Sequence, residues 1–351
     1  MKKISLIIPN YNTSAFIDQC IKGLEKQSIG MDAMEIILID DCSSDDTLEK
    51  LRSIETRFPE SVILIPLDHN VRQGAARNIA LQYASADYVA FLDADDSLHP
   101  KALEKILRKA HEDNADVVSF LSVKTHTPGE ICTDTKSGRK DLSLSIENDE
   151  IRRMFVMSDA VTPGCWDKLY RRSVITGNNL RFAEGVLLEE PLFTFPLYFY
   201  IRKFSMLNEY LYNYYQNPQG TCRSLFYDEA HQYDNVRVQY ELLLDLERRG
   251  LLEKFHNEIG IKFTDCYYYQ SILNMFAIGR RIDTDVINNM SDTIRQYFPD
   301  IKSNPYLKSF PLVRENINML DLRISPDNFD SYKALWEKII QQSSSADIIS
   351  R

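Results

Sequence analysis

The sequence predicts an α/β fold for its first third and a mainly helical region after about residue 225. In the first third, short apolar segments alternate with segments whose apolar residues recur at helical spacing; from about residue 226, helical spacing dominates. Apolar strands separated by amphipathic helices indicate parallel βαβ units, with helices covering both faces of a Rossmann-like, mostly parallel sheet. The 351 residues, 44% of them hydrophobic and 26% charged, suit about two domains.

The predicted elements of the first third follow one another in strict alternation. Strands are expected at residues 4–8, 35–39, 62–66, 88–92 and 117–121. Helices are expected at residues 13–27, 46–57, 73–84 and 100–114. The caps expected are Thr13 or Ser14 for the first helix and Ser44 or Asp45 for the second, with Pro100 in the first turn of the fourth.

The rest of the chain begins with a stretch that shows no periodicity. Residues 124–145 are rich in Gly, Pro, Ser and Thr, so a loop is expected there. A helix at 147–158 and a short strand at 211–215 follow. Later helices are expected at residues 228–249, 251–277, 283–297 and 329–341. We place a domain boundary near residue 224, which separates a domain at 1–224 from a helical region at 225–351, and expect a disordered tail.

Charge and cysteine usage restrict the class of protein. The net charge of −10 and the lack of a long basic run argue against a nucleic-acid partner. The six cysteines form no CxxC pair, which argues against a zinc ribbon and favours free thiols in a reducing cytosol. The apolar run at 4–8 is too short for a signal peptide, and no run reaches the ~18 residues of a membrane span. We expect a soluble, cytoplasmic protein, and leave open a peripheral contact with the inner face of the membrane.

Polar segments follow four of the predicted strands. They are PNYN at 9–12, DDCSSDD at 40–46, LDHNVRQG at 67–74 and DADDS at 93–97. Ligands of such sheets bind outside the carboxyl ends of the strands, so these segments should converge on one binding site.

The segment DADDS contains the strongest signal for a metal. Asp93 and Asp95 leave the strand at alternate positions, so their carboxylates would repel each other. A hard cation such as Mg²⁺ or Mn²⁺ would relieve this repulsion and would bring a diphosphate with it. The alternative is that Asp95 or Asp96 caps the helix that begins near Pro100. For Asp96 we favour the structural role, in which it helps to start that helix.

Two further segments suit a nucleoside. Asp40 can accept hydrogen bonds from a nucleobase or ribose; the alternative, a solvated turn, is favoured for its neighbours Asp45 and Asp46. In NVRQGAARN, at 70–78, Gly74 allows a close backbone approach and Arg77 suits a phosphate or nucleoside, unless it is a plain surface residue.

The segments CWDKLY (165–170) and LLEEPLF (187–193) suit acceptor binding and acid–base chemistry. Trp166 could stack on the apolar face of a sugar, but Trp is as often a core residue. Glu189 and Glu190 lie among apolar residues, which tends to raise the pKa of a carboxyl as a general base requires. The alternative is an exposed helix N-terminus, where Glu is favoured.

Six segments in order resemble family 2 glycosyltransferases of the GT-A fold, most closely the bacterial enzymes that build capsule, exopolysaccharide or teichoic-acid sugars. They are SLIIPNYN, EIILIDDCSSDDT, NVRQGAARN, YVAFLDADD, WDKLYRR and RFAEGVLLEEPLF. The resemblance covers about residues 1–224, with a nucleotide-sugar half at about 1–120 and an acceptor half at about 145–224. It implies transfer of a sugar from a nucleotide diphosphate donor, usually UDP, with inversion at the anomeric carbon.

The resemblance also implies roles for individual residues. Those placed at the uracil and ribose are Pro9, Tyr11, Asn12 and Asp40, and those completing the nucleoside pocket are Asn70, Gly74 and Arg77. Asp93-Ala94-Asp95 matches the DxD motif, in which Asp95 would ligate Mn²⁺ or Mg²⁺ and Asp93 would contact the ribose or assist at the metal. Glu190 takes the position of the base, which is usually Asp, with Glu189 as the alternative. Trp166 and Lys168 would contact the acceptor.

Two other functions compete with this one. A sugar-phosphate nucleotidyltransferase would have a Gly-rich loop with Arg and Lys after the first strand, where this chain has PNYNTS. A non-catalytic scaffold would bind a nucleotide sugar without turnover. The C-terminal region is expected to support homo-oligomerisation, to bind the acceptor, or to contact a membrane-bound, lipid-linked oligosaccharide.

Overall fold

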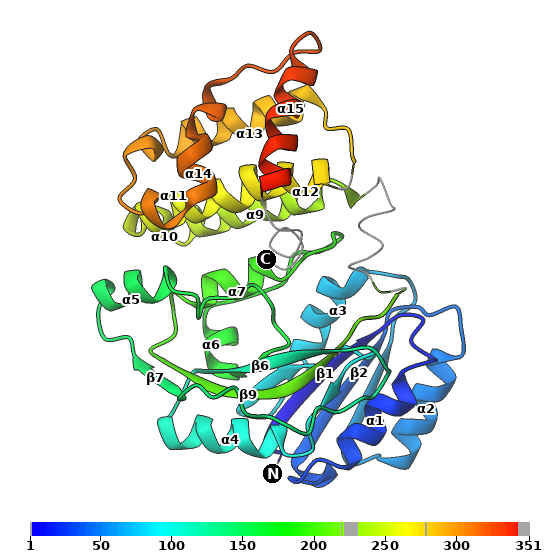
Figure 1. The fold of residues 1–351 in the computed structure, drawn as a ribbon. Helices are drawn as coiled ribbons and strands as arrows, with labels where there is room; N and C mark the ends of the chain where they lie inside the picture. Colours follow the sequence, from blue (N-terminus) through cyan, green and yellow to red (C-terminus); the bar gives the residue numbers. More distant parts are fainter. Residues whose placement is uncertain (1, 219, 221–230, 278, 343–351) are drawn as a thin grey trace. The chain divides into compact units, whose positions relative to one another are not determined.

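The computed structural model describes residues 2–218, 220, 231–277 and 279–342. The chain divides into two compact units, Met1–Arg223 and Ser224–Arg351, which are described separately below (Figure 1). The boundary expected near residue 224, the first residues of the helix expected at 228–249 and most of the C-terminal tail lie outside the described residues.

The N-terminal unit is built on one sheet, which has nine strands in its described part (Figure 1). Their order is β3-β2-β1-β4-β8-β6-β9-β5, with β7 paired to β9. The bounds are β1 Ile4–Asn10, β2 Met34–Asp40, β3 Val62–Pro66, β4 Tyr88–Phe91, β5 Ser97–Leu98, β6 Val117–Thr125, β7 Leu142–Ser145, β8 Lys168–Arg171 and β9 Lys203–Tyr215. Strands β3, β2, β1 and β4 are parallel, as expected. Beyond β4 the sheet is mixed, because β8 runs antiparallel to both β4 and β6.

Helices cover both faces of this sheet (Figure 1). Their bounds are α1 Ile17–Glu25, α2 Thr47–Arg57, α3 Arg72–Leu81, α4 Ala102–Asp113, α5 Asp149–Val156, α6 Arg172–Gly177 and α7 Pro191–Leu197, with a 3₁₀ turn, η1, at Met31–Ala33. The expected caps of α1 are wrong, since no side chain caps this helix and its first N–H groups bond to the Thr13 carbonyl. Asp45 does accept a hydrogen bond from the N–H group of Thr47, the first residue of α2.

Strands β7, β8 and β9 all differ from the sequence-based prediction. No strand was expected at β8, whose sequence KLYR has charged residues at both ends. Strand β9 begins at Lys203 rather than at residue 211, and register shifts beside Leu121 interrupt its pairing with β6. Such irregularities break the alternation of apolar and polar residues by which a strand is recognised in a sequence. Strand β7 likewise occupies the end of the expected loop at 124–145.

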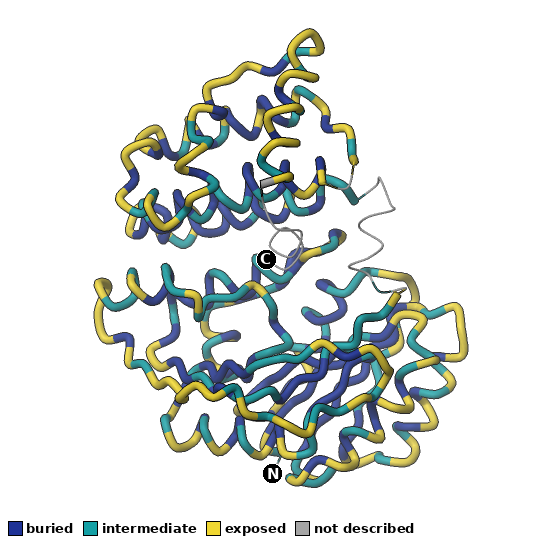
Figure 2. Tube along the Cα trace, viewed as in Figure 1, coloured by how far each residue is buried: buried dark blue, intermediate teal, exposed yellow. Residues whose placement is uncertain are grey.

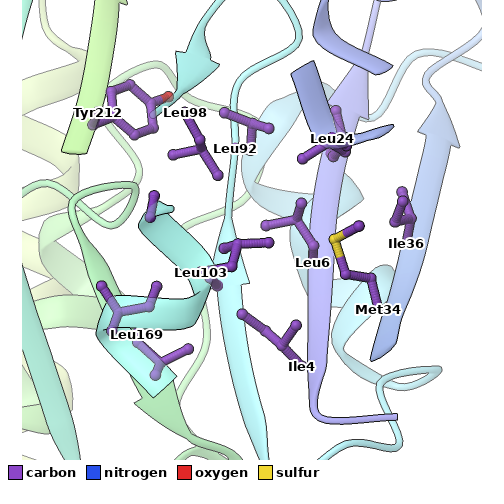
Figure 3. Packing of buried hydrophobic residues seen from close by; sticks show 14 of the residues in the cluster. Ile4, Leu6, Leu24, Met34, Ile36, Leu92, Leu98, Leu103, Leu169 and Tyr212 are labelled. Atoms are coloured by element: carbon purple, nitrogen blue, oxygen red, sulfur yellow. The ribbon is translucent and has the colours of Figure 1, made fainter. Parts of the chain in front are cut away.

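The core of this unit lies between the sheet and helices α1, α2 and α4. Figure 3 shows Ile4 and Leu6 of β1 packed among side chains of the neighbouring strands and of α1 and α4. On the other face, an aromatic cluster packs edge to face around Phe91. Figure 2 shows the consequence: the central strands are buried along their length, whereas the outer helices alternate between buried and exposed residues. Burial of both faces explains the apolar strand sequences.

The C-terminal unit is helical in its described part. Its helices are α9 Asp234–Arg248, α10 Leu251–Lys254, α11 His256–Phe263, α12 Ser271–Ala277, α13 Thr284–Tyr297, α14 Pro311–Asn316 and α15 Phe329–Gln342, with a π-helix, η3, at Thr264–Gln270 and 3₁₀ turns η4 Ile301–Ser303, η5 Leu307–Ser309 and η6 Ile317–Asp321. The single helix expected at 251–277 is therefore broken. Tyr267, Tyr268 and Tyr269 of the π-helix are buried and belong to the core of this unit. Within the described ranges, no helix is both long and apolar enough to cross a membrane.

Candidate active site

The carboxyl ends of the parallel strands meet at one edge of the sheet. Asn10, the last residue of β1, pairs with Asp40, the last residue of β2, and Asp40 pairs with Pro66 at the end of β3. On the other side of β1, Ile7 pairs with Phe91, which ends β4 just before Asp93. The polar segments that follow these strands are thereby brought together, as the alternation predicted.

Asp40 has the clearest capacity to bind a ligand on the β2 side. Its side chain is 1% exposed, and Oδ2 accepts a hydrogen bond of 3.3 Å from the N–H group of Ser43. Among the described residues, none bonds to its buried Oδ1. A buried carboxylate oxygen without a partner is costly, so this atom is available to a donor from a ligand. Pro9 lies partly buried on β1, and the Tyr11 side chain is 51% exposed beside it.

Asn12 and Asn70 hold the loops of this site together. The Asn12 side-chain oxygen accepts a hydrogen bond of 2.8 Å from the N–H group of Ser44, which joins the loop after β1 to the loop after β2. The Asn70 amide donates to the carbonyl of Asp41 at 3.2 Å. The Asp41 carboxylate in turn accepts a hydrogen bond of 2.7 Å from Val71. Asp41 was not singled out in the sequence, although it shares the DD pair with Asp40.

Gly74 and Arg77 lie on α3 and contact the segment before α7. A Cβ atom on Gly74 would lie 2.0 Å from the carbonyl oxygen of Ala183, so only glycine permits this approach. The Arg77 guanidinium is 1% exposed and donates to Asp93 Oδ1 at 2.8 Å and to Glu189 Oε1. The view of Arg77 as a plain surface residue is wrong. The close backbone approach expected at Gly74 is thus made by another segment of the protein.

The three carboxylates of DADDS differ in their partners. Asp93 bonds to Arg77 and, at 3.1 Å, to the amide of Gln73. Asp95 accepts a hydrogen bond of 2.8 Å from the Asn217 amide, and among the described residues it has no cationic partner. Burial, and then the charge of Asp93, raise the pKa of Asp95. Ala94 between them is buried.

Asp96 faces strand β9 instead. Its carboxylate accepts hydrogen bonds of 2.6 Å from the Tyr212 hydroxyl and 2.7 Å from the N–H group of Tyr215. Burial, followed by the charges of Asp93 and Asp95, raises its pKa well above the usual range. Asp96 therefore has a structural role, as expected, but it does not start the next helix, since α4 begins only at Ala102.

The remaining pair, Asp93 and Asp95, fits a divalent cation in part. Asp95 has a like-charged neighbour, Asp93, and no counter-ion among the described residues. A hard cation would relieve the repulsion between the two carboxylates. Asp93 has one oxygen engaged by Arg77. No group of three or more His, Cys, Asp or Glu side chains in the described ranges could hold a metal alone. Further ligands would therefore come from a bound diphosphate or water.

Glu190 immediately precedes α7 and is only partly buried. Its Oε1 accepts a hydrogen bond of 2.8 Å from the N–H group of Cys165. Burial, and then the charge of Glu189, raise the pKa of Glu190 to about 7, although Arg77 and the hydrogen bonds from Cys165 act in the opposite direction. Glu189 is buried and paired with Arg77, so it is not an exposed residue of a helix N-terminus.

Lys168 is the first residue of β8, and Trp166 lies in the turn before it. The Trp166 ring stacks on Tyr214 with centroids 5.6 Å apart and packs against Tyr212 at 4.6 Å. Lys168 is fully buried, and its ammonium donates to Thr162 Oγ1, the Gly164 carbonyl and Asp167 Oδ1. All three N–H groups are thus used within the protein. This departs from the expectation that Lys168 contacts the acceptor.

Comparisons with known proteins agree with the fold, and the class of protein that they define is the glycosyltransferases. Residues 5–175 match the model of Glycosyl transferase family 2, so the N-terminal unit belongs to this family. The chain is 28% identical, over 297 residues, to the cholesterol galactosyltransferase of Borreliella burgdorferi, a match that covers 81% of this chain and 79% of that protein. The poly(ribitol-phosphate) beta-N-acetylglucosaminyltransferase TarS of Staphylococcus aureus is 24% identical over 298 residues, which cover 84% of this chain but 50% of TarS.

Solved structures show the same fold. The crystal structure of S. aureus TarS 1–349 in complex with UDP-GlcNAc matches with a TM-score of 0.74 at 21% identity, and covers 98% of this chain and 93% of that chain. The mannosyltransferase PcManGT of Pyrobaculum calidifontis, in complex with GDP-Man and Mn²⁺, matches with a TM-score of 0.53 at 13% identity, over 90% of this chain and 86% of that chain. The predicted GT-A fold with a helical C-terminal region is confirmed.

Proposed function

We propose that this protein is a metal-dependent, inverting glycosyltransferase that moves a sugar from a UDP-sugar to a hydroxyl group of a glycan or cell-surface polymer. The observation that carries the proposal is Glu190. It is a partly buried carboxylate whose pKa is raised to about 7, held near the sheet edge that we assign to the nucleoside and diphosphate of the donor. A base with this pKa is half ionised near neutral pH. The ionised carboxylate can accept a proton there, and the resulting acid can keep it.

The donor would lie across the strand tips. Asp40 supports the nucleoside through its unpaired Oδ1, with Pro9 and Tyr11 beside it. Four further residues would shape this pocket through their contacts within the protein. They are Asn12, Asn70, Gly74 and Arg77. The choice of UDP is supported by TarS, whose structure was solved with UDP-GlcNAc.

Asp95, assisted by Asp93, would hold Mn²⁺ or Mg²⁺. When bound, such an ion neutralises charge that develops on the leaving diphosphate. Arg77 keeps Asp93 in place by donating a hydrogen bond to its Oδ1. The solved mannosyltransferase of the same fold was obtained with Mn²⁺, which is consistent with this assignment.

Glu190 would remove the proton from the acceptor hydroxyl. The hydroxyl oxygen then attacks the anomeric carbon in line, the bond to the diphosphate oxygen breaks, and its electron pair leaves with UDP, which inverts the centre. One base suffices for this reaction, whereas a covalent intermediate would need a second carboxylate as nucleophile. Glu189 is the less suitable base because it is buried and neutralised by Arg77.

The proposal is tested by release of UDP from a panel of UDP-sugars, with and without Mn²⁺ and with candidate acceptors such as poly(ribitol phosphate). We expect Mn²⁺-dependent turnover of at least one donor that is lost in Glu190→Gln. Binding of UDP-sugars without turnover by the parent protein would favour the scaffold. Release of pyrophosphate from UTP and a sugar phosphate would favour the nucleotidyltransferase. Work at the cytoplasmic face of the membrane on a lipid-linked acceptor stays a prediction.

A further inference from the structure

The loop at residues 162–165 is held by side chains in an unusual way. It lies between α5 and β8, and each of its four backbone carbonyl groups accepts a hydrogen bond from a side chain. The bonds are Tyr198 hydroxyl to Thr162 at 3.0 Å, Thr194 hydroxyl to Pro163 at 2.9 Å, Lys168 ammonium to Gly164 at 2.5 Å and Tyr170 hydroxyl to Cys165 at 2.9 Å. Regular secondary structure, which normally satisfies such carbonyls, is absent from this stretch.

The donors of these bonds come from two elements and are all buried. Lys168 and Tyr170 belong to β8, while Thr194 lies in α7 and Tyr198 directly after it. Each is fully buried. Buried hydroxyl and ammonium groups are costly unless they are paired, so the four donors and the four carbonyls depend on one another. The loop is therefore rigidly clamped between β8 and α7.

One peptide group of the loop connects this clamp to Glu190. The carbonyl of Gly164 and the N–H group of Cys165 belong to the same planar peptide and point in opposite directions when the peptide is trans, as it is here. The carbonyl end accepts from the Lys168 ammonium, and the N–H end donates to Glu190 Oε1 at 2.8 Å. Lys168 thus fixes and polarises the donor that holds the carboxylate.

We infer that Lys168 is a positioning residue for the base: it orients the peptide between Gly164 and Cys165, whose N–H group holds the Glu190 carboxylate. This inference rests on the proposed role of Glu190. Lys168 would then influence the acceptor indirectly, through the base. Its own ammonium has no N–H group left for a sugar, because all three are bonded within the protein.

The surroundings of Glu190 agree with this role. Its charged or titratable neighbours are Glu189 in its own segment, Arg77 on α3, Cys165 in the loop, and Lys168 and Tyr170 on β8. Burial raises the pKa values of Cys165 and Tyr170 well above their usual ranges, so both stay neutral. Lys168 and Arg77 are then the cations that favour the ionised carboxylate.

The test compares Lys168→Met with the double variant Lys168→Met/Asp167→Asn, which removes the partner charge as well and protects the fold. We expect both to bind UDP with the parent's affinity in calorimetry, and to keep the KM for the donor found in the screen. The kcat for UDP release should fall about 100-fold, as for a misplaced catalytic group. The acidic limb of the kcat–pH profile should move to higher pH, because an ammonium and a fixed N–H donor that favour the carboxylate are lost.

Tyr198→Phe and Tyr88→Phe form a matched pair of milder variants. Tyr198→Phe removes one hydroxyl of the clamp and should lower kcat in the same direction but less. Tyr88 is likewise a buried tyrosine of this unit, and its hydroxyl donates to the Ala115 carbonyl at 3.1 Å, at the opposite end of β4 from Asp93. Tyr88→Phe should lower the melting temperature by a similar amount and leave kcat and its pH profile unchanged.

Titration of the Glu190 carboxyl by infrared difference spectroscopy, with Glu190→Gln to assign the band, gives a readout that needs no turnover. We expect the band of Lys168→Met to titrate at higher pH than that of the parent. The inference is overturned if the Lys168 variants fold and keep both the parent's kcat and its Glu190 band, or if kcat falls equally in Tyr88→Phe. An active Glu190→Gln would instead disprove the proposed base, whatever the infrared result for Lys168.

Discussion

At the scale of single residues, the site depends on which carboxylates are neutralised by the protein. Arg77 is shared between Asp93 and Glu189, so its single charge serves one of the two proposed metal-binding carboxylates and the residue beside the proposed base. Asp95 and Glu190 form no ion pair with a cationic side chain among the described residues, and both have raised pKa values. These are the two positions at which the proposed mechanism needs a metal ligand and a base.

Glu190→Gln should abolish transfer while stabilising the fold at alkaline pH. The pKa of Glu190 is raised in the folded state to about 7 from an ordinary value of 4.5, so its ionisation opposes folding increasingly between these values and fully above pH 7. Glutamine removes that cost. We expect kcat to fall by roughly 10²–10⁴-fold and the melting temperature to rise at pH 8 relative to the parent, but not at pH 4. A melting temperature lowered at pH 8 would contradict the raised pKa.

Glu189→Gln provides the contrast to that variant. Removing this carboxylate leaves Arg77 with Asp93 alone, so a buried cation loses a partner and stability should fall by about 3–5 kcal/mol. Urea unfolding measures the loss, and the folded fraction should still turn over. Full activity in Glu190→Gln together with an inactive but folded Glu189→Gln would reverse the assignment of the base.

Asp95→Ala should remove metal-dependent binding of the donor. The carboxylate is the one of the DxD pair without a cationic partner in the described structure, so it contributes most of the negative charge offered to an ion. Calorimetry with UDP, in the presence and absence of Mn²⁺, checks this. An affinity that still responds to Mn²⁺ as in the parent would exclude Asp95 as the metal ligand.

At the scale of elements, the site is assembled by the approach of segments that are distant in sequence. Helix α3 touches the segment 183–189 so closely that Gly74 has no room for a side chain. Strand β9 holds the segment 93–96 through Asp96, and the clamp between β8 and α7 holds Glu190 through the loop at 162–165. Each contact places one part of the proposed site relative to the sheet.

Gly74→Ala should destabilise the unit by about 1–3 kcal/mol and reduce activity, because the new methyl group would displace the Ala183 carbonyl. Gly23→Ala is the control. Gly23 lies in α1, where an added Cβ meets nothing within 4 Å, and alanine there should stabilise the helix by about 0.5–1 kcal/mol. Equal effects of the two substitutions in urea unfolding would show that the contact with Ala183 is not tight.

At the scale of the whole chain, the candidate site residues all belong to the unit Met1–Arg223. This unit has its own core and sheet, so a chain that ends at residue 218 should fold and bind UDP with Mn²⁺ as the full chain does. If the C-terminal region supports oligomerisation, size-exclusion chromatography should show the truncated chain as a monomer. An unchanged oligomeric state would exclude that role for the C-terminal region.

The sequence by itself determined the periodic part of the fold and the place of the site. Apolar strands and amphipathic helices are recognisable locally, since period and composition are properties of consecutive residues, and β1 to β4 were predicted within a few residues. The rule that ligands bind at the carboxyl ends of parallel strands then located the site, and the order of six motifs indicated the family that the comparisons confirmed.

Only the tertiary structure decided which polar residues face a ligand and which are used within the protein. Arg77 and Glu189 are 112 positions apart. The resemblance places Lys168 at the acceptor, whereas its ammonium is bonded to Thr162, Gly164 and Asp167. The structural role of Asp96 was predicted for the wrong element for the same reason, because its partners lie on β9. The pairing of charges depends on distances between segments that local periodicity does not specify, so the roles of these residues follow from packing alone.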